Sequence, residues 1–320
     1  MAVKSEESRT LSPSFVDTLL KGVLNPIIER VKNDHTLMLA IRDGYINIYY
    51  RGGNLLAIKS ATGGYKATFD TDYNKTGGLI PKLPETISTQ EESRQWVEAF
   101  PKLKEVMDHY FSNHAKPERE FQQLIARENN FSTVSNQSEY FITDIEFADS
   151  TLGARFDMLA IQWLASDRKN AHNCKAALVE VKYGDDALGG NAGLKKHLKD
   201  IELFVSDPEK YGKLLGTMEG QLNQLHKLGL VNCKGSDQGA EVTLKIDTKP
   251  EVIFILANHN PRSKKLEDIL ASETVKKYAA SDKFDLRFFV ACSSGYAMHR
   301  GCMLSLADFE KYLKIFKVFD

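Results

Sequence analysis

The pattern of hydrophobic and polar positions in residues 1–110 is that of a small sheet flanked by helices. Runs of β-forming residues broken by Asp-Gly and Gly-Gly pairs predict an antiparallel sheet over about 36–70, because such pairs supply the positive φ of hairpin turns. A helix over 14–34, broken or kinked near Pro26, is expected before the sheet, and a helix over 90–112 after it. We therefore expect an N-terminal α+β domain that contacts a substrate or a partner.

Residues 111–320 alternate instead between helical and strand patterns. The elements expected in chain order are a helix that Pro117 opens, strands at 139–148, 154–164 and 176–184, a helix at 194–204, a helix marked by Leu215, Met218, Leu222 and Leu225, a strand at 251–258, a helix at 263–278 and a strand at 284–292. This order predicts a second domain with a mixed α/β core.

Composition limits the class of protein. A chain of 320 residues with 42% hydrophobic and 27% charged residues is typical of a folded protein with two domains or one elaborated domain. The net charge is −1, so any contact with nucleic acid must come from a local basic patch. The four cysteines lie far apart and form no CxxC pair, which argues against a zinc site or a disulfide framework. The polar N-terminus and the lack of a long apolar run favour a cytoplasmic protein without membrane contact.

The stretch LVEVKYG at residues 178–184 places two charged residues in an otherwise apolar strand. Because strand side chains alternate between faces, Glu180 and Lys182 share one face, with their Cβ atoms roughly 7 Å apart. An isolated Glu-x-Lys is typical of a solvated strand edge or of a weak ion pair. Whether this pair has a function therefore depends on which residues the neighbouring strand places beside it.

That neighbouring strand carries RFDML, in which Asp157 interrupts another apolar run. A hairpin-like connection between 154–164 and 176–184 would bring Asp157 close to Glu180. Two nearby carboxylates raise each other's pKa unless a cation lies between them, and oxygen ligands of this kind suit Mg²⁺, for which Mn²⁺ can substitute. Lys182 would then orient or help deprotonate a metal-bound water, or stabilise charge on a phosphate during hydrolysis.

This Asp…Glu-x-Lys arrangement, with its αβββαβ order of elements, resembles the PD-(D/E)XK nuclease superfamily over about residues 110–300. The resemblance implies a restriction-endonuclease-like αβββαβ core with a mixed central sheet. It also implies a Mg²⁺-dependent endonuclease that hydrolyses DNA, with RNA not excluded and a homodimer as a common form. On this resemblance Asp157 and Glu180 bind the metal and act in catalysis with Lys182. Phe156 stands where the family motif has Pro, a departure that does not affect the ligand.

In several branches of this superfamily a Glu from the first core helix joins the metal site. The stretch KPEREFQQLI resembles that helix start, and Glu118 best matches the branch pattern as a catalytic and metal-binding residue. Acids in a first helical turn also simply complement the helix dipole. Glu128 is a second candidate, because helical spacing places it near the apolar face of the same helix. The sequence leaves this choice open.

A basic cluster follows the Gly-rich loop after the LVEVKYG strand. Lys195, Lys196 and Lys199 lie there together with His197, in the stretch LKKHLK. Such a cluster is usually a solvated helix face. Next to the expected site, however, the three lysines would bind nucleic-acid phosphates and make binding depend on salt.

Other charged residues allow further interpretations. The N-terminal sheet would form a DNA clamp if its basic residues shared one face, namely Arg42, Arg51, Lys59 and Lys66. Asp144 and Glu146 are alternative acids for the site, although an exposed strand face also explains them.

Taken together, these patterns predict a metal-dependent nuclease that acts in restriction, defence or repair. The alternative is a module of the same fold that binds nucleic acid or a partner without cutting, which the nearly neutral net charge keeps open. A serine hydrolase is disfavoured, because the chain has no G-x-S-x-G nucleophile elbow.

Overall fold

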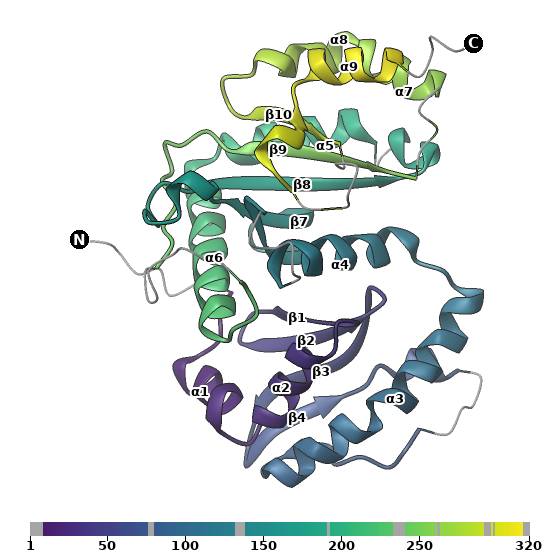
Figure 1. Cartoon of the computed structure of the whole chain (residues 1–320), viewed down its shortest axis with the longest axis vertical. Coiled ribbons are helices and arrows are strands. Elements are labelled where there is room, and N and C mark those ends of the chain that lie inside the picture. Colours follow the sequence, from purple (N-terminus) through teal and green to yellow (C-terminus); the bar gives the residue numbers. More distant parts are fainter. Residues whose placement is uncertain are drawn as a thin grey trace.

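The computed structural model describes residues 9–75, 80–131, 138–190, 193–232, 241–258, 260, 263–290, 296 and 298–315. Over these residues the chain forms two β-sheets with helices packed around them (Figure 1). One sheet has five strands and is antiparallel, whereas the other has six strands and is mixed. The fold class is therefore α/β, with a separate antiparallel sheet in the N-terminal part.

The N-terminal part consists of a sheet with strand order β1-β2-β3-β4-β5 and three helices. Its elements are α1 (Pro13–Lys21), α2 (Asn25–Asn33), β1 (Leu37–Ile41), β2 (Tyr45–Tyr50), β3 (Gly53–Ala61), β4 (Gly64–Thr68), β5 (Thr86–Ile87) and α3 (Gln90–Asn113). The predicted antiparallel sheet over about 36–70 is confirmed. Gly44, Gly52 and Gly63 have φ of 70°, 71° and 80° in the three hairpin turns, as the glycine pairs require.

The prolines in this part have different effects. The expected break near Pro26 lies just before it, because α1 ends at Lys21 and Pro26 occupies the first turn of α2. In contrast, α3 continues through Pro101 for 24 residues. Its buried side chains, among them Trp96 and Phe100, offset the roughly 3 kcal/mol that an interior proline costs. Because α3 ends at Asn113, the expected boundary between residues 110 and 111 falls inside a helix.

The second part is built around the sheet with strand order β11-β10-β9-β8-β7-β6. Its elements are α4 (Pro117–Asn130), β6 (Tyr140–Asp149), β7 (Ala154–Gln162), β8 (Lys175–Tyr183), α5 (Leu194–Val205), α6 (Pro208–Lys227), β9 (Glu251–Ala257), α7 (Lys264–Ala271), α8 (Glu273–Lys276), β10 (Asp285–Phe289), β11 (Met303–Leu304) and α9 (Leu306–Ile315). Strand β9 runs parallel to β8 and β10, and the other neighbours are antiparallel. The expected strands all form, and β11 and α9 are additions that the sequence patterns did not predict.

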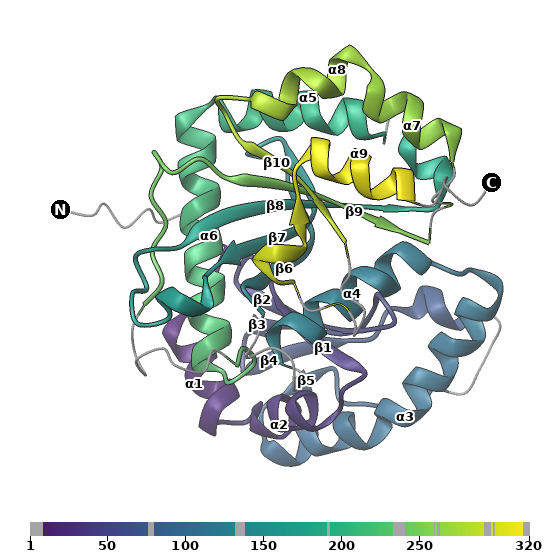
Figure 2. The ribbon, with the colours of Figure 1, turned by 45° about the horizontal axis from the view of Figure 1, so that its top comes forward.

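Helices cover both faces of the larger sheet (Figures 1 and 2). One face packs against α4 through an apolar cluster that includes Val179, Val181 and Ile125. The opposite face packs against α5, α6 and α9 through residues such as Leu178 and Leu198. Because α4 also contacts side chains of β1 and β2, it lies between the two sheets. The alternation of β8 thus places Glu180 and Lys182 on the α5 side of the sheet.

A buried ion pair joins the two sheets. The guanidinium of Arg42 pairs with Asp144 and also donates to the Tyr49 hydroxyl at 2.8 Å and the Ile145 carbonyl at 2.9 Å. The side-chain amide of Gln221 donates to the Ile41 carbonyl at 3.1 Å and to Asp144 at 3.3 Å. Asp144 therefore does not lie on an exposed strand face, and the interpretation of that acid as solvated is wrong.

The same contacts bear on the proposed DNA clamp. Arg42 is buried in its ion pair, and Arg51 is held by Asp108 and Glu120, each at 2.8 Å. Two of the four basic side chains of the clamp are thus neutralised by acids within the protein. The four residues therefore do not form one basic face, although Lys59 and Lys66 are exposed and lie opposite each other across β3 and β4.

No helix in the described part of the chain is long and apolar enough to cross a bilayer.

Candidate active site

The pairing of β7 with β8 brings two carboxylates together. Met158 lies opposite Val179 in this antiparallel ladder, so Asp157 and Glu180 are the next residues across from one another. Val181 donates its main-chain N–H to Asp157 Oδ2 at 2.9 Å, which fixes the Asp157 carboxylate against β8. The expected convergence of Asp157 and Glu180 is therefore present in the fold.

Lys182 contacts both carboxylates. Its Nζ lies 3.1 Å from Glu180 Oε2 and 3.7 Å from Asp157 Oδ2. The Lys182 and Glu180 side chains are 5% and 1% exposed, whereas Asp157 retains 19% exposure. The three residues thus form a nearly buried charged cluster with one carboxylate open to solvent.

The two carboxylates differ in their electrostatics. Burial and the negative charge of Glu180 raise the pKa of Asp157 from 3.8 to about 7. Burial also raises the pKa of Glu180, but the hydrogen bond from His197 and the charge of Lys182 outweigh burial, so that its pKa is lowered. At neutral pH the cluster therefore has an ionised Glu180 and an Asp157 that still retains a proton in part of the molecules.

Glu118 joins this cluster from the first turn of α4. Burial raises the pKa of its carboxyl, Lys182 acts in the opposite direction, and Glu146 and Glu180 raise it further. The main-chain amide of Tyr183 also acts to lower the pKa of Glu118. Glu118 thus lies beside the end of β8, within electrostatic reach of Lys182 and both acids of the cluster.

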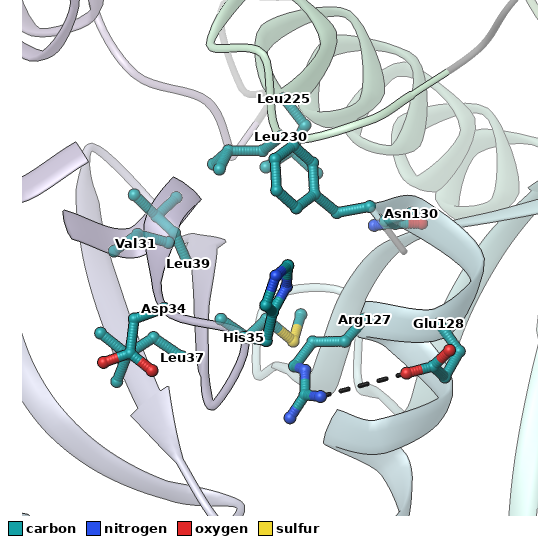
Figure 3. A pocket seen from close by; sticks show the side chains of 12 residues that line it. Val31, Asp34, His35, Leu37, Leu39, Arg127, Glu128, Asn130, Leu225 and Leu230 are labelled. Atoms are coloured by element: carbon teal, nitrogen blue, oxygen red, sulfur yellow. Dashed lines mark ion pairs between the residues drawn. The ribbon is translucent and has the colours of Figure 1, made fainter. Parts of the chain in front are cut away.

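Glu128, the competing candidate, lies elsewhere. It lines an apolar cavity of about 300 Å³ between β1, the end of α4 and the end of α6 (Figure 3). Its carboxylate is 4.0 Å from Arg127, and His35 projects into the same cavity. Helical spacing alone could not separate the two acids, because Glu118 reaches the site from the first turn of α4 rather than from its apolar face.

Glu146 lies near the cluster but is held by another residue. Its carboxylate pairs with Arg119 at 2.9 Å, and its φ of 51° is in the left-handed region that glycine usually occupies. The side chain is one-fifth exposed and acts on Glu118 through its charge. Glu146 therefore flanks the four residues Glu118, Asp157, Glu180 and Lys182, which we call the acid cluster.

His197 was not assigned a role from the sequence, yet it contacts the acid cluster. Its Nδ1 lies 2.8 Å from Glu180 Oε2, so the ring N–H donates to that oxygen. The signal was in the helical spacing, because His197 is three residues after Leu194 and four before Ile201, both of which are buried. This spacing turns the ring inward, in contrast to the lysines around it.

A cleft of about 540 Å³ opens onto Asp157 and Glu180 between α5 and the β6–β7 turn, and we call it the α5 cleft. Of the three lysines expected to bind nucleic acid, only Lys196 lines this cleft, and it pairs with Asp200. Lys195 and Lys199 are exposed elsewhere on α5 and make no ion pair with any described residue. The helix thus places one of the three lysines at the site.

The acid cluster has features of a divalent-cation site. Glu180 Oε1 is buried without a hydrogen-bond partner, while Oε2 binds both Lys182 and His197. No three described His, Cys, Asp or Glu side chains form a ready metal cage. Mg²⁺ commonly binds through one or two carboxylates, waters and the substrate phosphate, so a complete protein cage is not required. An unpaired buried oxygen beside a second carboxylate fits such a cation.

Comparisons of the chain with models of protein families, with curated proteins and with solved structures found no significant match.

Proposed function

We propose that this protein is a metal-dependent nuclease that hydrolyses phosphodiester bonds in DNA, with a restriction-endonuclease-like core. One observation carries the proposal: Asp157 and Glu180 meet across neighbouring strands with Lys182 between them, and one buried oxygen of Glu180 is unpaired. A lysine that contacts two carboxylates at the floor of a cleft matches the arrangement that the resemblance to the PD-(D/E)XK superfamily implies.

The order of elements around the acid cluster supports the same proposal. Helix α4 is followed by the antiparallel strands β6, β7 and β8, then by α5 and α6, and then by β9 parallel to β8. This is the expected αβββαβ order with one additional helix. The proposed metal ligands lie on the second and third strands, as the resemblance implies.

Each residue of the acid cluster has a proposed role. Asp157 and Glu180 would hold Mg²⁺ or Mn²⁺ together with Glu118, and His197 would fix the orientation of the Glu180 carboxylate. The bound cation would supply a Lewis acid and lower the pKa of a coordinated water. The Lys182 ammonium would orient the attacking water or stabilise negative charge on the phosphate.

The test is cleavage of circular single-stranded and double-stranded DNA in Mg²⁺ or Mn²⁺, with EDTA as the metal-free control. Circular substrates have no ends, so cleavage reports an endonuclease. We expect wild type to cut only with metal and Lys182→Ala to lose at least about 100-fold in rate, because general acid–base and electrostatic contributions are of this order. Lys21→Ala, which removes an exposed lysine at the end of α1, serves as the matched control.

The outcome distinguishes nuclease from binding module. Cutting that persists at the wild-type rate in Lys182→Ala would mean that the site is misplaced or the preparation contaminated. DNA binding without cutting of either substrate would instead favour the module that binds nucleic acid without hydrolysis.

A further inference from the structure

Two hollows lie on either side of the acid cluster. The α5 cleft reaches Asp157 and Glu180 from the α5 face of the sheet. A second hollow of about 430 Å³, which we call the α4 hollow, lies between the first turns of α4 and the β2–β3 turn. Tyr183, the residue after Lys182, lines this second hollow.

The acid cluster connects the two hollows. Glu180 lines the α5 cleft and contacts Lys182, which acts electrostatically on Glu118. Glu118 directly follows Pro117, and Pro117 and Tyr183 both line the α4 hollow. A nucleic-acid strand that crosses the end of β8 would therefore contact both hollows while one of its phosphates lies at the acids.

The α4 side carries an aromatic surface. The ring of Phe121 lies 6.3 Å from Tyr183 and 5.4 Å from Tyr296, centroid to centroid, both in edge-to-face geometry. Tyr296 is 37% exposed and is one of few large apolar side chains exposed among the described residues. Tyr296 is exposed and Phe121 and Tyr183 are half-buried, and an exposed aromatic ring is a surface on which an unpaired base stacks.

The α5 side carries an apolar and a basic contact. Leu203 is 64% exposed and lines the α5 cleft together with Arg155. Arg155 is exposed and makes no ion pair with any described residue, in contrast to Lys196, which is paired with Asp200. Arg155 is therefore a cation of this cleft that is available to a phosphate, and Leu203 offers a surface to a base or sugar.

The acids themselves are recessed. Glu180 and Lys182 are almost fully buried, so a phosphate must enter the α5 cleft to reach them. A single strand can place one nucleotide in a cleft of this size, whereas a base-paired duplex keeps its phosphates on a wide, stiff cylinder. The aromatic surface on the α4 side can stack only with bases that are not paired.

We infer that the substrate of this site is a single strand of DNA, with its bases on the aromatic surface of α4 and its backbone passing Arg155 in the α5 cleft. The inference rests on the proposed nuclease function for the role of the acids. The surfaces that select an unpaired strand, however, are independent of catalysis.

The experiment measures binding and cleavage separately. Binding of one labelled oligonucleotide, as a single strand, as a duplex and as the equivalent RNA, is followed by fluorescence anisotropy in Ca²⁺. Cleavage of the same molecules is then measured in Mg²⁺ and Mn²⁺. We expect the single strand to bind about twenty-fivefold more tightly than the duplex, since one stacking contact and one apolar contact, at about fivefold each, are lost on pairing.

Three surface variants test the residues. Tyr296→Ala should weaken single-strand binding about fivefold or more through lost stacking, and Leu203→Ala about fivefold through a lost apolar contact. Ile315→Ala, at an exposed apolar residue at the end of α9, is their control. Arg155→Ala should reduce the slope of log affinity against log salt by about 0.7, with Lys21→Ala as its control. Melting temperatures equal to that of wild type establish that the variants are folded.

The outcomes separate this inference from the proposed function. Suppose that the duplex is bound as tightly and cut as fast as the single strand, and that Tyr296→Ala and Arg155→Ala do not change single-strand binding. This result would overturn the inference but would still support the nuclease. A single strand bound preferentially through these residues but never cut would uphold the single-strand binding surfaces, but it would overturn both the nuclease and the single strand as its substrate. Preference for single-stranded RNA over DNA would overturn the assignment to DNA.

Discussion

Replacing Asp157 with Asn should stabilise the metal-free protein at neutral and alkaline pH. The pKa of Asp157 is raised from 3.8 to about 7, because the side chain is largely buried and lies beside Glu180. At about 1.4 kcal/mol for each pKa unit, this shift of roughly three units corresponds to about 4 kcal/mol of lost stability when Asp157 is ionised. Asn is isosteric and its Oδ1 can accept the hydrogen bond from the Val181 N–H, so Asp157→Asn should recover much of this free energy.

The pH dependence has a defined sign. Below pH 3.8 the carboxyl of Asp157 is protonated in both folded and unfolded chains, and its contribution to stability is complete. Between pH 3.8 and about 7 only the unfolded chain releases the proton, so wild type loses stability as pH rises. Above about pH 7 the loss is complete. The advantage of Asp157→Asn should therefore grow from about pH 4 to 7 and then remain constant.

Urea unfolding in EDTA at pH 4.5 and pH 8 measures this difference as a change in the free energy of unfolding. Asp285→Asn is the matched control with the opposite sign, because burial raises the pKa of Asp285 but hydrogen bonds from Lys175 and Lys249 lower it overall. That variant should be less stable than wild type at pH 8. If Asp157→Asn were also less stable than wild type at pH 8, the ion pair with Lys182 would outweigh burial, and our account of the cluster would be wrong.

Three further predictions concern metal binding, the two candidate acids of α4 and the buried ion pair between the two sheets. Mn²⁺ at 100 times its Kd should stabilise wild type by about 2.7 kcal/mol in thermal unfolding, and an equal gain in Glu180→Gln would argue against this metal site. Glu118→Gln should lower the rate of metal-dependent cleavage at least about tenfold. Glu128→Gln should not, and the reverse result would exchange their assignments. Arg42→Met should cost about 3–5 kcal/mol in urea unfolding because it leaves Asp144 buried and unpaired, and the double change Arg42→Met/Asp144→Leu should recover most of that loss. Additive effects of these two changes would refute the coupling.

The turns and the strand alternation followed from the sequence alone. The Asp-Gly and Gly-Gly pairs predicted the N-terminal hairpins, because only glycine takes positive φ at low cost, and Gly44, Gly52 and Gly63 do so. The two-residue period of a strand likewise placed Glu180 and Lys182 on one face of β8. These features depend on residues that are neighbours in the chain, which is why local patterns determine them.

The sequence also indicated which acids would meet, but not how they would be held. A hairpin-like connection from β7 to β8 made an antiparallel pair with Asp157 near Glu180 a reasonable prediction. The sequence could not show that Lys182 contacts both acids or that His197 binds Glu180, because these contacts depend on the depth of the strands and the rotation of α5. The spacing of His197 relative to Leu194 and Ile201 was the one local signal for the latter.

Only the tertiary structure shows whether each charged side chain is solvated, paired in the interior or part of the site, because these residues have similar patterns in the sequence. Arg42 and Asp144 resembled surface residues, yet they pair in the interior because two sheets distant in sequence pack together there. Glu118 and Glu128 stand on the same helix, and only the position of its first turn beside the end of β8 brings one of them to the acid cluster. A charge has the same local pattern whether it is solvated, paired or part of a site. Its environment is set by elements distant in the chain, about a hundred residues away for Arg42 and Asp144, and that information exists only once the chain has packed.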